Sequence, residues 1–172
     1  MKIGRWPKSI LCGFLLLLPV CCLADIVWVQ VGVDGLTCSQ CSRSVEMSIR
    51  KLSFVQDVQM NLEHTEGKIT FKAGAKIDFK KIANAVLDAG FSVRYLSIGF
   101  NFENTSVTSG TCFPFNGDQF QFVKTESKIL NGESTLKLIG KRYMAPKEFK
   151  KWKEDLTPVC DKSKGEVLYV TL

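Results

Sequence analysis

Hydrophobic and polar positions follow two different periods in the first half of the chain. Residues 26–33 are mostly β-branched and apolar, which predicts a central strand. Apolar side chains then recur every three or four residues over 41–52, as on one face of a helix. Residues 55–63 and 69–71 return to alternation on either side of a turn, which predicts two strands joined by a hairpin.

A second helix and one more strand complete this unit. Asp78 suits the N-cap of a helix with one apolar face, and Gly90 is suited to end it. Apolar and polar residues alternate again over 91–95, which predicts the last strand. The order β-α-β-β-α-β over residues 26–98 therefore predicts a ferredoxin-like sandwich, an α+β fold.

The second half of the chain predicts a separate small unit. Residues 100–111 are rich in Asn, Ser, Thr and Gly, a composition typical of a linker between domains. We therefore expect one domain over 25–99 and a small α+β domain of unknown role over 112–172. The predicted elements of the second domain are strands near 119–124, 134–140 and 166–171 and a helix over 146–156.

The first 24 residues have the layout of a secretory signal peptide. Three basic residues and no acid accompany an apolar run over 10–20, and Cys22-Leu23-Ala24 places small residues before a cleavage point. The run is shorter than the ~20 residues that a membrane span needs, and a retained anchor is the alternative. We expect an exported protein, periplasmic or secreted, with no stable membrane anchor after cleavage.

The positive charge of the chain does not indicate a nucleic-acid partner. The leader holds three of the 23 basic residues and none of the 17 acidic ones, so it accounts for part of the net charge of +6. In the remainder, basic residues are interspersed with acidic ones. Nucleic acid requires a concentrated basic face, which this pattern does not provide.

Four cysteines remain after the leader, and their spacing divides them into two pairs. Cys112 and Cys160 are isolated and far apart, which predicts a structural disulfide in an oxidising compartment. Cys38 and Cys41 form a Cys-x-x-Cys pair whose two thiolates can hold one soft metal ion. A zinc site built from all four cysteines is an alternative, but such sites usually combine two closely spaced pairs.

The loop that carries the close pair, GLTCSQC over residues 35–41, closely resembles the Gly-Met-Thr-Cys-x-x-Cys loop of the heavy-metal-associated domain family. That family includes copper chaperones, the N-terminal modules of metal-pumping ATPases and periplasmic mercury-binding proteins. The resemblance covers about residues 26–98. It implies a metal ion held by Cys38 and Cys41 at an exposed tip, with Leu36 packed beneath the loop in place of the family's Met.

The same resemblance extends to the turn Asp88-Ala89-Gly90-Phe91, which it places beside the metal loop. Phe91 would then shield the site with apolar surface. The alternative is that Phe91 is simply the first core residue of the last strand. His64, the only histidine, lies in a hairpin turn that we place at the opposite end of the domain and treat as a solvated residue.

Among soft ions, Cu(I) fits the pair best. Two thiolates satisfy Cu(I), whereas Zn(II) prefers four ligands, and residues 37–45 contain no acid, His or Met to add one. The start of a helix beside the cysteines favours thiolate over thiol, and Arg43 adds a positive charge. Hg(II), Ag(I) and Zn(II) stay as alternatives.

These features predict a non-enzymatic protein that captures a soft metal ion or exchanges it with a donor or acceptor protein. The main alternative is a thiol–disulfide oxidoreductase that uses Cys38 and Cys41. Such enzymes usually place a proline between the cysteines, but residues 25–99 contain no proline. A third alternative assigns the main activity to residues 112–172, which contain no histidine to act as a base.

Overall fold

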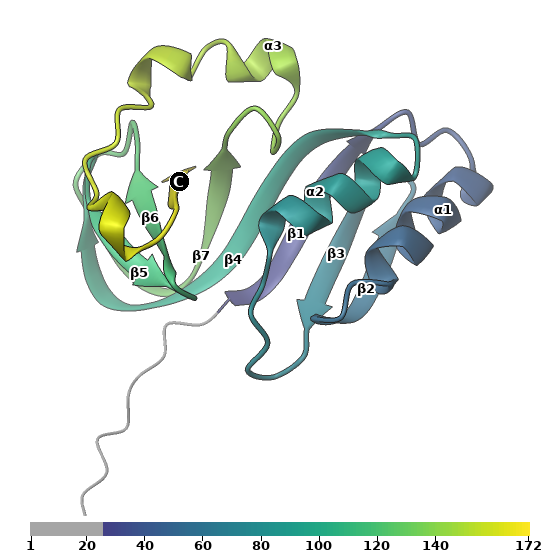
Figure 1. Ribbon diagram of the computed structural model, residues 1–172, viewed down its shortest axis with the longest axis horizontal. Helices are drawn as coiled ribbons and strands as arrows, with labels where there is room; N and C mark the ends of the chain where they lie inside the picture. The colour runs from purple at the N-terminus through teal and green to yellow at the C-terminus, as the bar shows by residue number, and fades with distance from the viewer. Residues whose placement is uncertain (1–25) are drawn as a thin grey trace, which may run out of the picture.

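The first part of the chain folds as its pattern predicts. The computed structural model describes residues 26–172, so the signal peptide predicted over 1–24 lies outside the described residues (Figure 1). Six elements follow one another in the expected order: β1 (Ile26–Asp34), α1 (Ser39–Arg50), β2 (Val55–Asn61), β3 (Glu66–Phe71), α2 (Phe79–Asp88) and β4 (Ser92–Val107).

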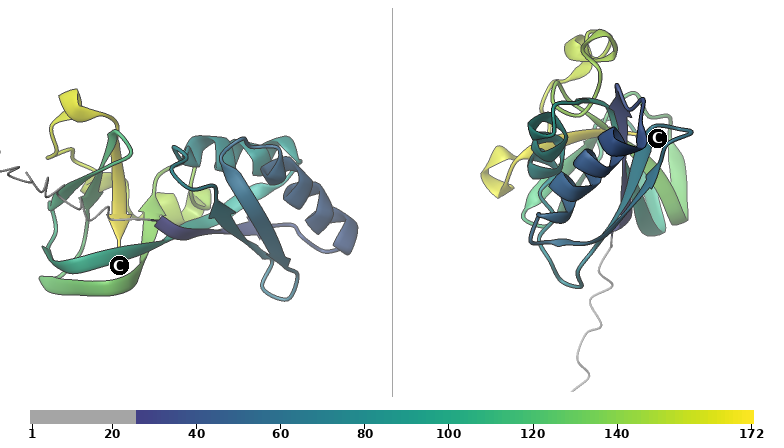
Figure 2. Two further views of the ribbon diagram at one scale, coloured as in Figure 1. Left: turned by 90° about the horizontal axis from the view of Figure 1, so that it is seen from below. Right: turned by 90° about the vertical axis from the view of Figure 1, so that its right-hand side faces the viewer.

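Strands β1 to β4 form a ferredoxin-like sheet. β1 pairs antiparallel with β3 on one side and with β4 on the other, and β2 pairs with β3 at the edge. Both α1 and α2 lie on the same side of this sheet (Figure 2, left). Val29, Val31 and Val33 of β1 are completely buried, as inward-facing positions of a central strand should be. The predicted ferredoxin-like fold is therefore confirmed for this part of the chain.

Helix α2 begins and ends where its flanking residues predict. Asp78 caps it, because the side-chain carboxylate accepts a hydrogen bond from the backbone N–H of Lys81 at 3.0 Å. Gly90 follows its end with φ +88°, a backbone conformation that glycine adopts without strain. Within residues 26–172, the structure contains no helix that is both long and apolar enough to cross a membrane.

Strand β4 continues well beyond its predicted end. It pairs with β1 as far as Phe100 and with β7 from its middle to its end. The linker predicted over 100–111 is therefore wrong for residues 100–107. The polar residues of this segment are mostly exposed, whereas Phe100, Phe102 and Val107 are buried. Alternation between the two faces of a strand thus outweighs a composition that resembles a loop.

The second half of the chain extends the same sheet. Its elements are β5 (Cys112–Phe115), β6 (Asp118–Phe122), β7 (Lys128–Ile139), α3 (Pro146–Phe149), the 3-10 helices η1 (Lys153–Asp155) and η2 (Lys162–Lys164), and β8 (Val167–Thr171). Eight strands form one mixed sheet in the order β2-β3-β1-β4-β7-β8-β6-β5. The three predicted strands are present with shifted ends, and β5 was not predicted. The division into two domains is a prediction that this shared sheet does not confirm.

The helix predicted over 146–156 is shorter in the structure. α3 ends at Phe149, and a turn and the 3-10 helix η1 follow it. Phe149, Trp152 and Leu156 nevertheless pack together against a small cluster that includes Met144. Successive tight turns therefore bury the apolar positions that the pattern assigned to one longer helix.

Phenylalanine side chains connect the two halves into one core. Phe100 of β4 packs against Phe113 and Phe115 of β5, with ring centroids 5.2 and 5.5 Å apart. Phe79 at the start of α2 meets Phe120 of β6 edge to face at 6.0 Å. Such pairs are favourable because the edge and the face of an aromatic ring carry opposite partial charges. The core therefore continues from the ferredoxin-like part into the second half.

Cys112 and Cys160 form the disulfide that their spacing predicts, with Cα atoms 5.8 Å apart. The buried side chain of Gln121 fixes the same segment, because its oxygen accepts hydrogen bonds from the backbone N–H groups of Val159 and Cys160. Its amide nitrogen donates to the carbonyl of Thr157 at 2.8 Å. A long connection without a strand is thereby tied to β5 and β6.

Replacing Cys112 and Cys160 by serine should lower the free energy of unfolding by roughly 2–4 kcal/mol, because the unfolded chain gains the freedom of an open loop. The bond joins residues that are 48 positions apart in the sequence. Chemical denaturation without reductant measures the change. The double variant Cys38→Ser, Cys41→Ser is the matched control, since its two positions are only three apart and closing so short a loop contributes less. Equal losses in the two variants would contradict this structural role.

Candidate metal centre

The loop between β1 and α1 is anchored from below by one apolar side chain. Leu36 is 5% exposed and belongs to the core, while Thr37 and Cys38 are exposed. Gly35 precedes it with φ +87°, a conformation that disfavours side chains with a Cβ atom. The packing of Leu36 that the resemblance implied is confirmed, and the loop above it faces solvent.

The two close cysteines flank the first residues of α1. Cys38 is the N-cap, and its sulfur accepts a hydrogen bond from the backbone N–H of Cys41 at 3.1 Å. Their Cα atoms lie 5.2 Å apart, and the two sulfurs are at disulfide distance. Cys38 is exposed, whereas Cys41 is half-buried and packs against the core. One sulfur therefore faces solvent and the other is held by packing, close enough together to contact one ion.

The charges near the loop favour negatively charged sulfur. Unpaired backbone N–H groups at the start of a helix carry partial positive charge, and the first turn of α1 holds no acidic residue. Glu46, further along the helix, pairs with Arg50 at 2.7 Å. Arg50 donates hydrogen bonds to Glu46 and to Asp57, and both raise the pKa of its guanidinium group, the bond to Glu46 more than the bond to Asp57. These carboxylates are thus engaged away from the cysteines.

The turn between α2 and β4 lies beside this loop. A Cβ atom at Gly35 would be 3.7 Å from the ring of Phe91, so the ring borders the loop. Phe91 is half-buried and also packs against the core. Both interpretations of Phe91 are therefore met, because the same side chain belongs to the core and lies next to the metal loop.

The hairpin between β2 and β3 lies at the same end of the sheet as the loop. The backbone N–H of Val33, at the end of β1, donates to the carbonyl of Thr65 in that hairpin at 2.9 Å. The expectation that His64 lies at the opposite end is therefore wrong, because β3 runs antiparallel to β1 and starts where β1 ends. The predicted order of strands and helices is enough to place this hairpin at the end of the sheet where β1 ends. The side chain of His64 is exposed, as expected for a turn.

The distant cysteines do not contribute to this loop. Cys112 and Cys160 are bonded to each other, which contradicts a zinc site built from all four cysteines. Among residues 26–172 there is no group of three or more His, Cys, Asp or Glu side chains placed to hold a metal ion. The candidate site therefore consists of the two sulfurs of Cys38 and Cys41.

Comparison with known proteins finds relatives for part of the chain. The family model of the heavy-metal-associated domain matches residues 30–92. The copper chaperone CopZ of Bacillus subtilis is 38% identical over 61 residues, which cover 36% of this chain and 87% of CopZ. The periplasmic component of the mercuric transport protein of Serratia marcescens is 36% identical over 63 residues, which cover 37% of this chain and 68% of that protein.

Other matches differ widely in length. A copper-transporting ATPase of Rhizobium meliloti is 37% identical over 65 residues, and the chain spans only 8% of its length. Among solved structures, oxidized MerP from Ralstonia metallidurans is 32% identical, with a TM-score of 0.37, over 40% of this chain and 94% of that one. Each of these matches covers less than half of the present chain.

The conformation of Gly35 makes it the most sensitive backbone position of the loop. Gly35→Val should destabilise the protein by about 1–2 kcal/mol, because a branched side chain at φ +87° crowds the following carbonyl oxygen. Thr37→Val is the matched control, since Thr37 is exposed and does not have a positive φ. Chemical denaturation measures both changes. A Gly35→Val protein as stable as the Thr37→Val protein would show that the loop relaxes at no cost.

Proposed function

Because the chain belongs to the heavy-metal-associated domain family, we propose that it is an exported protein that carries one soft metal ion, Cu(I), between Cys38 and Cys41. The ion is its cargo, received from or passed to a partner protein. The observation that supports this most is the position of the two sulfurs at the start of α1, one exposed and one packed against the core. The names of its relatives, a copper chaperone and a mercuric transport component, agree with such a role.

Metal binding requires the reduced form of the cysteine pair. The disulfide between Cys38 and Cys41 takes up two electrons and two protons from a thiol reductant to give two thiols. Coordination of the ion then releases both protons, since thiolates are the ligands. The backbone N–H of Cys41, which donates to the sulfur of Cys38, stabilises negative charge on that sulfur.

Two sulfur ligands suit Cu(I) better than Zn(II). Soft sulfur prefers a soft ion, whereas Zn(II) in structural sites is almost always four-coordinate. In the part of the chain that the structure describes, no third His, Cys, Asp or Glu completes a group around the pair. Arg43, exposed on α1, repels a divalent ion more strongly than a monovalent one. Hg(II) and Ag(I) are also soft, so competition experiments have to separate them from Cu(I).

The unequal exposure of the two cysteines supports transfer of the ion. An acceptor thiolate can approach from the solvent side of Cys38, while the packing of Cys41 keeps the loop in place. Exchange between neighbouring thiolates moves the ion without releasing it into water. A chaperone or carrier needs this combination of a defined site and an accessible ion.

A thiol–disulfide oxidoreductase is the second candidate, favoured by the disulfide between Cys38 and Cys41. Exposed Cys38 would then be the attacking thiolate. The absence of proline from residues 25–99 counts against this candidate. Catalytic turnover in a disulfide-reduction assay, lost when either cysteine is replaced by serine, would favour the oxidoreductase over the carrier.

The reduced protein should bind one Cu(I) ion per chain, with an affinity orders of magnitude above that for Zn(II), because two thiolates satisfy only the softer ion. Competition against a Cu(I) chelator in the presence of reductant measures the affinity. Cys38→Ser and Cys41→Ser should each abolish tight binding. The double variant Cys112→Ser, Cys160→Ser is the matched control and should bind normally. Comparable affinity for Zn(II), or Cu(I) binding that survives loss of both Cys38 and Cys41, would overturn the proposal.

Export is expected to remove the leader between Ala24 and Asp25, because small residues precede this bond and a charged start and apolar run precede them. N-terminal sequencing of the exported protein should begin at Asp25. Recovery of the protein from a membrane fraction with Met1 retained would indicate an anchor instead.

A further inference from the structure

The second half of the chain places a short segment beside the metal loop. The backbone N–H of Ala145 donates to the carbonyl of Arg94, near the start of β4, at 3.0 Å. Arg94 lies three residues after Phe91, whose ring borders the loop. The start of β4 also pairs with the end of β1, from which the loop leaves. The segment over 141–147 therefore lies at the same end of the sheet as the close cysteine pair.

The same segment contacts the end of α2 that leads toward the metal loop. Arg142 donates from Nη1 to the side-chain oxygen of Asn84 at 2.6 Å. Leu87, in the last turn of α2, is 49% exposed and lines a hollow of about 470 Å³ together with Lys141 and Arg142. Lys147 follows in α3 and is also exposed. We call Leu87 and the three cations Lys141, Arg142 and Lys147 the basic surface.

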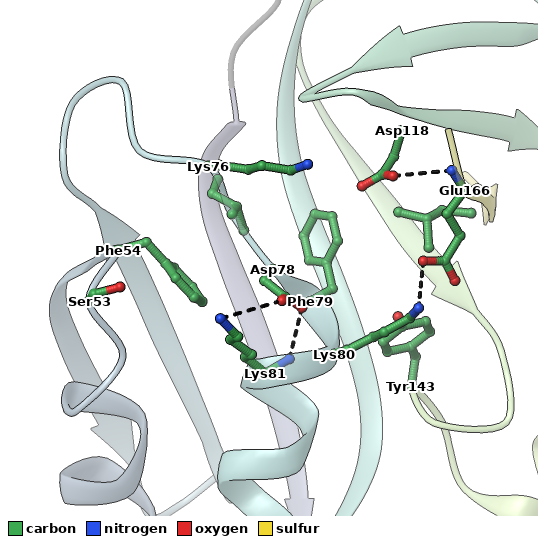
Figure 3. Close-up of a pocket in the computed structure, with 12 residues that line it drawn as sticks. Ser53, Phe54, Lys76, Asp78, Phe79, Lys80, Lys81, Asp118, Tyr143 and Glu166 are labelled. Carbon is green, nitrogen blue, oxygen red and sulfur yellow. Dashed lines mark hydrogen bonds and ion pairs between the residues drawn. The ribbon is translucent and has the colours of Figure 1, made fainter. Parts of the chain in front are cut away.

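The carboxylates that border the basic surface are mostly paired with other cations. Glu166 lines the same hollow and pairs with Lys80 at 2.6 Å (Figure 3). Glu148, in α3, pairs with Lys151 at 2.6 Å. Asp88 at the end of α2 is exposed, and it is the negative charge that remains.

The three cations of the basic surface have no such partners. Within residues 26–172, none of the ion pairs involves Lys141, Arg142 or Lys147. Three unpaired cations therefore face one carboxylate, that of Asp88, and the surface has an excess of positive charge. Exposed charges of one sign attract a molecule of the opposite sign before the two touch.

We propose that the basic surface docks an acidic surface of the partner protein with which the metal ion is exchanged. This inference rests on the proposed carrier function, because a partner whose thiolates reach Cys38 also lies against the neighbouring surface. Acidic side chains of the partner meet the three cations, and an apolar side chain covers Leu87. Protein interfaces commonly have such an apolar centre within a polar rim. The second half of the chain thus supplies recognition beside a metal site that the first half forms.

Transfer of Cu(I) from the loaded protein to synthetic acceptor peptides tests the proposal. Each peptide contains Cys-Ser-Gln-Cys, flanked on both sides by three Glu or by three Gln residues. At low salt, the Glu peptide should accept the ion at least about tenfold faster than the Gln peptide, because opposite charges speed the encounter. The difference should disappear at ~1 M salt, where charges are screened within about 3 Å. Quenched-flow mixing followed by metal analysis measures the rates. Equal rates for the two peptides at low salt would overturn the proposal.

Two triple variants with the same change in net charge locate the surface. The first replaces the three cations of the basic surface by glutamine, and it should lose most of the preference for the Glu peptide. The matched control replaces Lys51, Lys76 and Lys128, which are exposed and form no ion pair in the described part of the chain. They follow the end of α1, precede the start of α2 and begin β7, all remote from the metal loop. Equal losses in the two variants would show an effect of net charge alone and would overturn the proposal.

A measurement without metal separates docking from the carrier function. The Glu peptide with both cysteines replaced by serine is added to the protein during an NMR titration of its backbone amides. The amides of Leu87, Arg142 and Lys147 should shift in a saturable manner. These shifts in a protein that fails to bind Cu(I) would contradict the carrier function and still support the docking surface. The absence of saturable shifts, shifts confined to another region, or tighter binding of the same surface to phosphatidylglycerol vesicles would each overturn the proposal.

Discussion

Strand β4 is the element on which both halves of the molecule depend. Its inward side chains fall on alternate residues as far as Phe102, and an irregularity between Phe102 and Thr105 then brings Val107 to a buried position. These inward positions must fit two different sets of neighbours. Leu96 and Ile98 are buried in the ferredoxin-like core, and Phe100 packs on the aromatic side chains of β5. Any shift of register by one residue would expose this whole apolar row. The two halves are therefore fixed relative to each other by the same alternation that forms the strand.

The residue that precedes β4 also supports the cysteine loop. Phe91 precedes the strand and borders the loop at Gly35, and Leu36 is buried beneath it. The loop is thus supported by core residues although its outer surface is exposed. In the proposed metal site, this arrangement would combine a fixed ligand geometry with access from solvent. A fully enclosed site would hold an ion more firmly, but it would block the thiolate exchange that a carrier requires.

The sequence predicted the local features well and the boundary between the two halves poorly. The pair Cys38 and Cys41, the cap at Asp78 and the first four strands follow from short-range patterns, which single residues or spacings determine. The linker over 100–111 was predicted from composition, and the structure shows that residues 100–107 continue β4. A stretch rich in polar residues can be a loop or a strand with one face in water, and composition alone does not distinguish the two. The partner of that segment, β7, lies about thirty residues further along the chain, beyond the range of any local pattern.

The position of His64 also could not be predicted from a local pattern. Both strands of its hairpin were predicted correctly. The end of the sheet at which the hairpin lies depends on how many times the chain has reversed direction by that point, and the expectation about that end was wrong. The ion pair between Lys80 and Glu166 had no local signal at all. It forms because the fold brings the segment before β8 against α2, although the two are far apart in the sequence. Sites formed within one turn of a helix can therefore be recognised from sequence, whereas sites formed between distant elements require the fold.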